Sequence, residues 1–314
     1  MLRDPLNINA TLPWEHGILV ERAESDLPDV SVVIPIYNAG AFLEKTLRSL
    51  MCNDLNGVEI ILMDGGSTDN TAEIVDHYRD IFHVVVMQKD AGQSDAINKG
   101  FERATKGILY WLNGDDIILA NALTKMRRAF RDNKRADVIV GNAYLTEVDF
   151  STIRQFVFSN DKLRFDYLLD YASHHLVQPS VFFTRHAWAT CGPCNIDMHY
   201  AMDADLFLSM ASRFDFVHLD VDIAYSVYHE DCKTRGKRAE SIAELALVQA
   251  KHGGLDHARN TLNILINLFN ELSRAPTSEP PSAHSITERK LAALEEEMRK
   301  NREMLLDLDV SSTS

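Results

Sequence analysis

Four apolar runs, each followed by a polar loop and then by helical periodicity, constrain the fold of this 314-residue chain more than any other feature. The runs span residues 30–37, 58–63, 82–87 and 108–112, and a shorter run at 138–140 ends the series. Because the runs are almost entirely apolar, they predict strands that are buried on both faces. Strands of this kind that alternate with helices predict an α/β fold with a mostly parallel, Rossmann-like sheet and helices on both faces.

Polar loops follow each of the first four predicted strands. Right-handed crossovers would place these loops at one edge of the sheet, where open α/β sheets bind ligands. Three of the four loops contain Asp, so this edge is the predicted ligand site. The loops are Tyr37-Asn38, Asp64-Gly65-Gly66-Ser67, Asp90 to Asp95, and Asn113-Gly114-Asp115-Asp116.

The adjacent carboxylates Asp115 and Asp116 follow a strand that is predicted to be buried. Two such groups repel each other unless a cation or hydrogen bonds compensate their charges. Hard oxygen ligands suit Mg²⁺ or Mn²⁺, which commonly complete their coordination with substrate phosphates. The alternative is that the two residues only end the strand and cap a helix that begins near Ile118.

The composition excludes several classes of protein. The net charge of −14 argues against a nucleic-acid-binding protein, since such binding depends on Lys and Arg. No run of apolar residues is long enough for a membrane span, and the N-terminus has no pattern of a secretory signal. Four cysteines are too few for a disulfide framework and fit a reducing cytoplasm. We therefore expect a cytoplasmic protein.

The chain divides into segments of different character. We expect an irregular arm at 1–29, a catalytic domain at 30–235 with halves at 30–141 and 142–235, and C-terminal helices at 236–273, which Gly253-Gly254 would separate into two. Within the second half, the pattern predicts helices near 162–171 and at 202–211 and paired strands at 216–219 and 223–227. A Pro- and Ser-containing linker at 274–285 and a helical tail with a disordered end at 286–314 would follow. The C-terminal helices are candidates for forming a homo-oligomer or for docking peripherally at the inner face of a membrane.

Four motifs in order resemble those of the family 2 glycosyltransferases. They are Val32 to Asn38, Asp64 to Thr71, Asp90-x-Gly92-Gln93-Ser94-Asp95-Ala96-x-Asn98-Lys99-Gly100-Phe101, and Leu112 to Asp116. Members of this family are inverting enzymes of the GT-A fold that use nucleotide-activated sugars. The resemblance covers roughly residues 30–235 and implies a sugar donor, most simply UDP-linked, and a glycan or lipid-linked acceptor.

The resemblance assigns the donor side of the site. Asp64 would bind the nucleotide base, the loop from Pro35 to Asn38 would cover base and ribose, and Asp90 would border the same pocket. Asp115 would contact ribose or sugar, and Asp116 would bind the Mn²⁺ or Mg²⁺ that bridges the two phosphates. The full set of expected donor contacts is Pro35, Tyr37, Asn38, Asp64, Gly65, Ser67, Asp90, Gln93, Ser94, Asn113 and Asp115.

The second half carries the expected acceptor side and catalytic base. Asp203, at the start of a predicted helix, matches the family's catalytic base, with Asp205 as an alternative base or an acceptor contact; Asp203 could instead be only a helix cap. His229 matches a histidine that contacts metal or diphosphate, and Lys233 could neutralise phosphate. Gln178, in the segment that follows His174 and His175, is the candidate acceptor contact.

Three alternatives remain open at the level of sequence. Cys191 and Cys194 have the C-x-x-C spacing of a zinc or redox site, with Cys232 and His229 downstream, although a plain turn also explains them. The chain could be a non-catalytic module that binds nucleotide sugars. It could also be a sugar-phosphate nucleotidyltransferase, although residues 36–40 carry no basic side chain.

Overall fold

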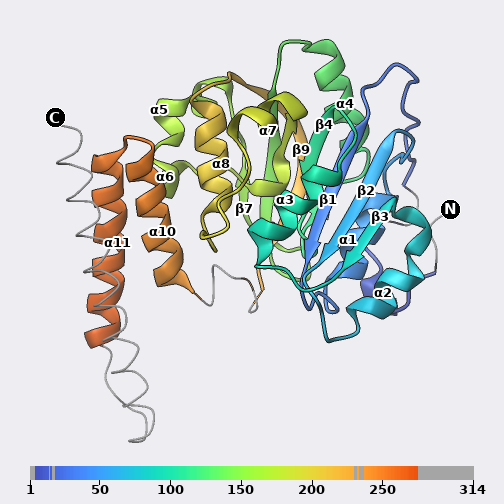
Figure 1. Cartoon of the computed structure of the whole chain (residues 1–314), viewed down its shortest axis with the longest axis horizontal. Helices are drawn as coiled ribbons and strands as arrows, with labels where there is room; N and C mark the ends of the chain where they lie inside the picture. Colours follow the sequence, from blue (N-terminus) through green and yellow to red (C-terminus); the bar gives the residue numbers. More distant parts are fainter. Residues whose placement is uncertain (1–3, 14, 16–17, 230–231, 233–236, 275–314) are drawn as a thin grey trace, which may run out of the picture. The chain divides into compact units, whose positions relative to one another are not determined.

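The computed structural model describes residues 4–13, 15, 18–229, 232 and 237–274 (Figure 1). The expected linker and tail lie outside these residues, apart from Arg274. The described residues form two compact units. The first contains the residues up to Leu168 and Leu176–His229, and the second contains Leu169–His175 and the residues from Cys232 onward.

A parallel half-sheet forms the first part of the larger unit. β1 (Val30–Ile36) lies between β2 (Val58–Asp64) and β4 (Ile108–Trp111), and β3 (Val84–Met87) pairs with the outer side of β2. All residues of β1, β2 and β4 are buried, as expected for strands covered on both faces. The carboxyl ends of these strands therefore meet at one edge of the sheet.

The second part of the unit extends the same sheet with strands of both directions. The order is β3-β2-β1-β4-β8-β6-β9-β5, and β7 pairs with β6. β8 (Val181–Thr184) is antiparallel to β4 and β6, so β6 (Val138–Thr146) and β9 (Phe216–Val227) run in the direction of β1 to β4. Only β5 (Ile117–Ile118), β7 (Thr152–Phe156) and β8 run the other way among the described strands. The predicted α/β class with a mostly parallel sheet is confirmed.

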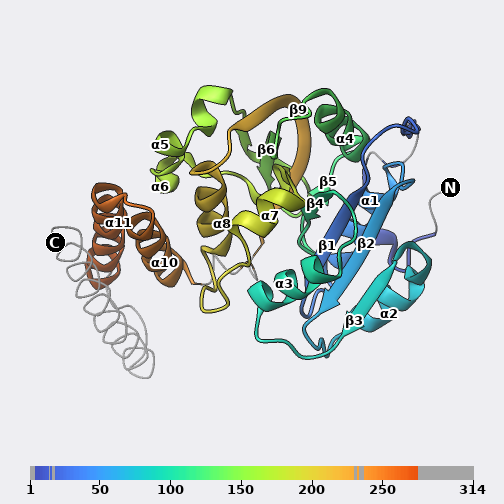
Figure 2. The ribbon, with the colours of Figure 1, turned by 45° about the horizontal axis from the view of Figure 1, so that its top comes forward.

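Helices cover both faces of this sheet (Figures 1 and 2). α1 (Leu43–Met51), α2 (Thr71–His77) and α4 (Ala122–Asp132) pack on the face formed by Val30, Val32, Ile34 and Ile36. α3 (Gln93–Arg103) packs on the opposite face, where Gly100 lies against Val33. Phe101 of α3 contacts Trp188 of α7 (Arg185–Cys191) with ring centroids 4.6 Å apart.

Two predicted elements differ from the observed ones near the strand β9. The helix expected near Ile118 begins only at Ala122, because Ile117 and Ile118 form β5 and pair with β9. The two strands expected at 216–219 and 223–227 are one strand, β9, which follows β6 along its length. Residues 220 and 221, between the two predicted strands, form a bulge in β9 beside Gly141 and not a turn. β9 packs closely against Gly141, since a Cβ at this glycine would lie 2.1 Å from the Ile223 side chain.

The helix expected at 162–171 is also divided. Its residues form the 3-10 turn η3 (Asn160–Leu163), α5 (Phe165–Leu168) and α6 (Tyr171–His174). Arg164 has extended backbone angles of φ −75° and ψ 150°, which end the first piece. The helix α8 (Met202–Ala211), in contrast, has the expected bounds.

A buried ionic network ties the N-terminal arm to α1. Arg48 donates to Glu15 at 2.5 Å and to the Tyr78 hydroxyl at 3.2 Å, and Tyr78 donates to Glu44 at 2.9 Å. Glu44 also accepts the backbone N–H of Leu6 at 2.6 Å. Since the Arg48 and Glu15 side chains are only 3% and 1% exposed, each charge depends on the other for its compensation.

The smaller unit is helical. α10 (Arg238–Lys251) and α11 (Leu255–Arg274) pack through the buried residues Ala246, Ala250 and Ala258. The predicted pair of helices separated by two glycines is therefore present. In the part of the chain that the structure describes, no helix combines the length and apolar character that crossing a membrane requires.

The contact between α3 and the sheet generates a stability prediction. A Cβ at Gly100 would lie 2.4 Å from the Val33 side chain and 3.2 Å from Met63, so Gly100→Ala should overpack this face. We expect the free energy of unfolding in urea to fall by about 1–3 kcal/mol, although alanine favours helices. The matched control is Gly107→Ala, where nothing lies within 4 Å of the added carbon. Equal stability of the two variants would contradict the close packing of α3 on β1.

Candidate functional site

Three strand-end loops meet at the carboxyl end of β1. Ile36 is paired in register with Asp64, and its carbonyl accepts the N–H of Gly65 at 2.9 Å. On the other side of β1, Gly114 lies so close that a Cβ would be 2.5 Å from the Ile36 side chain. The loops after β2 and β4 are therefore adjacent to the same residue. This is the edge that the sequence predicts as the ligand site.

A hydrogen-bonded relay organises the loop after β2. Asp64 is 3% exposed and accepts the backbone N–H of Ser67 at 3.1 Å as well as the Ser67 hydroxyl. Ser67 Oγ in turn accepts the N–H of Asn38 at 2.7 Å, and Asn38 Oδ1 accepts the N–H of Thr68 at 2.9 Å. The relay fixes the loops after β1 and β2 against each other. Tyr37, 65% exposed, lies beside this relay in the sequence and offers an open aromatic ring.

Asp90 lies against the same loop. A Cβ on Gly65 would be 2.8 Å from Asp90 Oδ2, so the absence of a side chain at Gly65 admits the Asp90 carboxylate. The other oxygen, Oδ1, accepts the N–H of Gly92 at 2.9 Å. Gly92 has φ 114°, which an L side chain rarely adopts. The structure thus brings Asp64, Gly65 and Asp90 together, and Pro35 lies in β1 in register with Met63, the neighbour of Asp64.

Asn113 is the centre of a polar network at the end of β4. Its Oδ1 accepts the Trp111 indole N–H at 2.6 Å and Gln93 Nε2 at 2.9 Å. Its Nδ2 donates to Asp116 Oδ2 at 3.0 Å and to Gln178 Oε1 at 2.9 Å. The predicted donor-side residue Gln93 and the predicted acceptor-side residue Gln178 therefore share one amide.

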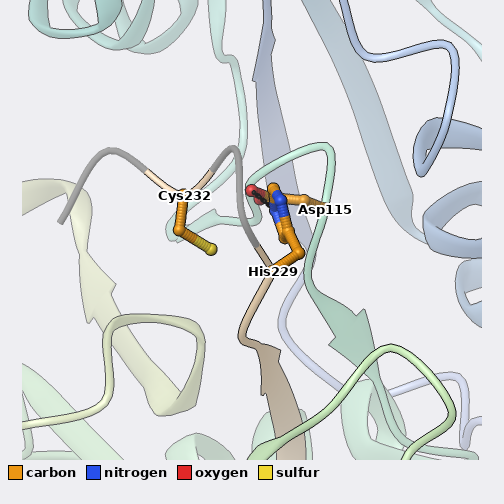
Figure 3. A group of neighbouring side chains, drawn as sticks. All are labelled: Asp115, His229 and Cys232. Atoms are coloured by element: carbon orange, nitrogen blue, oxygen red, sulfur yellow. Dashed lines mark hydrogen bonds and ion pairs between the residues drawn. The ribbon is translucent and has the colours of Figure 1, made fainter. Parts of the chain in front are cut away.

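The acidic pair Asp115 and Asp116 occupies two environments. Asp116 is 4% exposed, and burial together with the charge of Asp115 raises the pKa of its carboxyl above the usual range. Its Oδ1 accepts the N–H of Val227 at 3.3 Å. Asp115 is partly exposed, and its Oδ2 lies 3.1 Å from Nε2 of the buried His229. Figure 3 shows the His229 ring directed at Asp115.

An aromatic contact holds His229 in this place. The ring of Phe42, at the start of α1, stacks on the imidazole with centroids 4.0 Å apart and an interplanar angle of 28°. Cys232, also drawn in Figure 3, belongs to the second unit, so we confine the site to residues of the first. Lys233, the candidate phosphate contact, lies outside the described residues.

The side chains at this position fit a divalent cation. The Asp115 carboxylate and the His229 imidazole nitrogen converge, whereas Asp116, which the sequence predicts to share the ion with His229, is buried beside Asp115. A divalent ion would remove that repulsion and favour the ionised form of Asp116. Oxygen ligands with one imidazole suit Mn²⁺, whereas Mg²⁺ prefers oxygen alone.

The candidate base lies on the first turn of α8. The residue Asp203 as a whole is partly exposed to solvent, but protein atoms surround its carboxyl group. This burial raises the pKa of the carboxyl to about 6. One oxygen accepts the N–H of Ala204 at 2.8 Å. Asp205 is 8% exposed on the same turn. A carboxylate with a raised pKa is a stronger base than an exposed Asp, which suits proton abstraction from a hydroxyl group.

Two hydrogen-bonded contacts tie the segment before α8 to α3. Asn98 Nδ2 donates to the Cys194 carbonyl and Asn98 Oδ1 accepts the Cys194 N–H, both at 2.8 Å. Ser94 Oγ donates to the Met198 carbonyl at 3.1 Å. Burial, with Asp203 and Asp205 nearby, raises the pKa of Cys194 to about 12. The carboxylates of α8 are therefore held near the helix that begins at Gln93.

Other predicted residues have separate surroundings. Cys191 and Cys194 are free thiols, and neither belongs to a metal-ligand cluster among the residues that the structure describes. Gln178 lies in the first unit, whereas His174 and His175 belong to the second.

Sequence reasoning missed Phe42, Trp111 and the bonding role of Asn98. Asn98 stood within a quoted motif, whereas no spacing signal links Phe42 to His229.

Known proteins are similar to this chain in sequence and in fold. The sequence profile of glycosyl transferase family 2 matches residues 31–189, which is just over half of the chain. The chain belongs to this family. A "PGL/p-HBAD biosynthesis glycosyltransferase" from Mycobacterium bovis is 25% identical over 207 residues, which cover 65% of this chain and 77% of the relative.

Solved structures share the fold of this family member. S. aureus TarS 1–349 in complex with UDP has a TM-score of 0.56 at 19% identity, covering 80% of this chain and 73% of that one. The mannosyltransferase PcManGT from Pyrobaculum calidifontis, in complex with GDP-Man and Mn²⁺, has a TM-score of 0.56 at 16% identity. That match covers 94% of this chain and 88% of the mannosyltransferase. The predicted GT-A fold is confirmed.

The environment of Asp203 predicts a pH-dependent stability. Because its pKa is raised to about 6, the native state binds this proton more tightly than the unfolded chain does. The stabilisation from the protonated form is present below about pH 4 and is lost as the pH rises through about 6. Asp203→Asn should therefore raise the free energy of unfolding near neutral pH by on the order of 2 kcal/mol, and by much less near pH 4.

Urea denaturation at several pH values measures this difference. Asp132→Asn, on an exposed part of α4, serves as the control and should follow the unmodified protein at each pH. A variant of Asp203 whose stability difference is constant with pH would show that its carboxyl is not buried in the native protein.

Proposed function

We propose that this family 2 member is an inverting glycosyltransferase that moves a hexose or N-acetylhexosamine from a nucleoside diphosphate, most simply UDP, to a glycan or lipid-linked acceptor. The observation that carries the proposal is the gathering of Asp64, Asp90 and Asp116 at the carboxyl edge of β1, β2 and β4. The buried acid Asp203 lies on the adjoining α8. A donor pocket, a cation site and a base are the three parts that such a transfer needs.

The donor side would bind the nucleotide through the loops after β1, β2 and β3. Asp64 is oriented by Ser67, and its carboxylate can accept an N–H of the base. The exposed ring of Tyr37 offers a surface for the base or ribose, and Asp90 borders the pocket. The relatives with bound UDP and bound GDP-Man support a nucleoside diphosphate at this edge.

Asp116 and His229 would hold the cation, and Asp115, which contacts His229, would lie beside it. When bound, the ion stabilises the charge that develops on the departing diphosphate. Hydrogen bonds hold the Asp116 carboxylate and the Asp115–His229 contact orients the imidazole, so these side chains would bind the ion with little rearrangement. Mn²⁺ in the mannosyltransferase complex supports a cation at this place.

Asp203 would accept the proton of the attacking hydroxyl. A sugar hydroxyl is a poor nucleophile until its proton is removed in the transition state, and this proton can pass to a carboxylate whose pKa is raised towards neutrality. Attack from the side of α8, opposite to the departing diphosphate, would invert the configuration at the sugar carbon. Asp205 and Gln178 would contact the acceptor.

Ligand binding gives the first test. We expect UDP together with Mn²⁺ to raise the melting temperature of the protein, because a ligand that binds only the native state stabilises it. UDP-glucose, UDP-N-acetylglucosamine and GDP-mannose, each with and without Mn²⁺, would identify the donor. A protein that none of these ligands stabilises is not a nucleotide-sugar enzyme.

Two isosteric variants separate the cation site from the base. Asp116→Asn should abolish the Mn²⁺-dependent part of the thermal shift and the release of UDP from the preferred donor. Asp203→Asn should keep the thermal shift but lower turnover by about 10²–10⁴-fold. Asp132→Asn is the control for both. Full turnover in either variant would remove that residue from the mechanism.

A further inference from the structure

The side-chain amide of Asn113 has an orientation that its partners determine. The indole N–H of Trp111 is only a donor, so the Asn113 atom at 2.6 Å from it is the oxygen. The amide nitrogen then faces the carboxylate of Asp116 and the oxygen of Gln178. Gln178 is oriented independently, because its nitrogen lies 2.7 Å from the carbonyl oxygen of Trp111. The network is consistent in only one arrangement of the two amides.

All hydrogen-bonding capacity of the Asn113 side chain is used within the protein. An amide oxygen accepts two hydrogen bonds and an amide nitrogen donates two. In Asn113, the oxygen accepts from Trp111 and Gln93, and the nitrogen donates to Asp116 and Gln178. A nucleotide or sugar could bind this amide only by displacing one of these partners. Gln178, by contrast, uses one donor and one acceptor here and retains one of each for an acceptor hydroxyl.

We propose that Asn113 is a positioning residue, which sets the carboxylate of Asp116 and the side chain of Gln178 relative to each other and makes no contact with the substrate. The inference rests on the proposed function, since it concerns the cation-binding and acceptor-binding roles of these two neighbours. It replaces the direct donor contact that the sequence predicts for Asn113.

The geometry shows how Asn113 acts through Asp116. One carboxylate oxygen of Asp116 accepts from Asn113 at 3.0 Å, and the other accepts the N–H of Val227 at 3.3 Å. Together with a hydrogen bond from the Ser226 side chain, these bonds from β9 and from the end of β4 orient the carboxylate. A buried carboxylate that loses one of these bonds is free to rotate, and a change in the orientation of a ligand weakens a metal site.

The same amide connects a residue on the proposed donor side to a residue on the proposed acceptor side. Gln93 begins α3 on the donor side, and Gln178 lies before β8, 85 positions further along the chain. Both side chains bond to Asn113, so a change at the acceptor-side Gln178 reaches Asp116 through one residue. A direct contact between Asn113 and the donor would produce no such connection.

Mn²⁺ affinity in the presence of saturating UDP, measured by electron paramagnetic resonance, tests this role without turnover. Asn113→Ala should weaken Mn²⁺ binding by about 10–100-fold, the range for residues that orient a metal ligand. Binding of UDP in the absence of Mn²⁺ should be unchanged, because the amide does not touch the nucleotide. Gln155→Ala, on the exposed strand β7, is the matched amide control and should leave both affinities unchanged.

Gln178→Ala provides the sharper result. It should weaken Mn²⁺ binding in the otherwise unmodified protein, although Gln178 does not bond to Asp116, and it should have no further effect in the Asn113→Ala background. Trp111→Phe, which removes the indole donor together with part of the buried ring, should shift the Mn²⁺ affinity in the same direction by less. This variant also tests the proposal if Asn113→Ala does not fold.

Two results would overturn the inference. Unchanged Mn²⁺ affinity in Asn113→Ala with weakened metal-free UDP binding would make Asn113 a donor contact. Additive effects of the Asn113 and Gln178 variants would show that the two residues act separately. Failure of the proposed function is distinguishable from both, because the unmodified protein would then bind neither UDP nor Mn²⁺.

Discussion

The burial of the Asp116 carboxylate beside Asp115 is the interaction on which the rest of the site depends. A buried carboxylate is costly unless a cation or hydrogen bonds compensate it. Here the compensation comes from the nearby Asn113 and from the distant end of β9, since Asn113, Ser226 and Val227 bond to Asp116. His229, which follows β9, lies against Asp115. The strands β4 and β9 are therefore joined through this carboxylate pair as well as through the sheet.

The sequence predicts the first half of the fold and the donor side well, and the physical reason is local. Each apolar run ends in its own loop, and parallel strands bring such loops to one edge, so the proximity of Asp64, Gly65 and Asp90 follows from the order of the motifs. The second half is less predictable. β9 continues past Asp220 only because a bulge opposite Gly141 absorbs the extra residues, and a bulge has no period that distinguishes it from a turn.

Contacts between side chains that are distant in the sequence could not be predicted from it. Asn113 bonds to Gln93 and to Gln178, which are 20 and 65 positions away, and neither spacing carries a signal. A motif match assigns the residue type that a site contains, but hydrogen-bond saturation shows whether that residue is still available for a ligand. For Asn113, the structure shows that the side-chain amide has four hydrogen bonds within the protein.

The anchoring of the N-terminal arm has a consequence for the active edge. Glu15 and Leu6 are held by Arg48 and Glu44, which lie on α1. Phe42, the residue just before this helix, stacks on His229. Removing the residues before β1 would leave the Arg48 guanidinium buried without its counter-ion, Glu15. α1 would then be held less firmly, and the stacking of the Phe42 ring on the His229 imidazole would be weakened. Residues of the N-terminal arm therefore support the position of His229, although they lie far from it in the sequence.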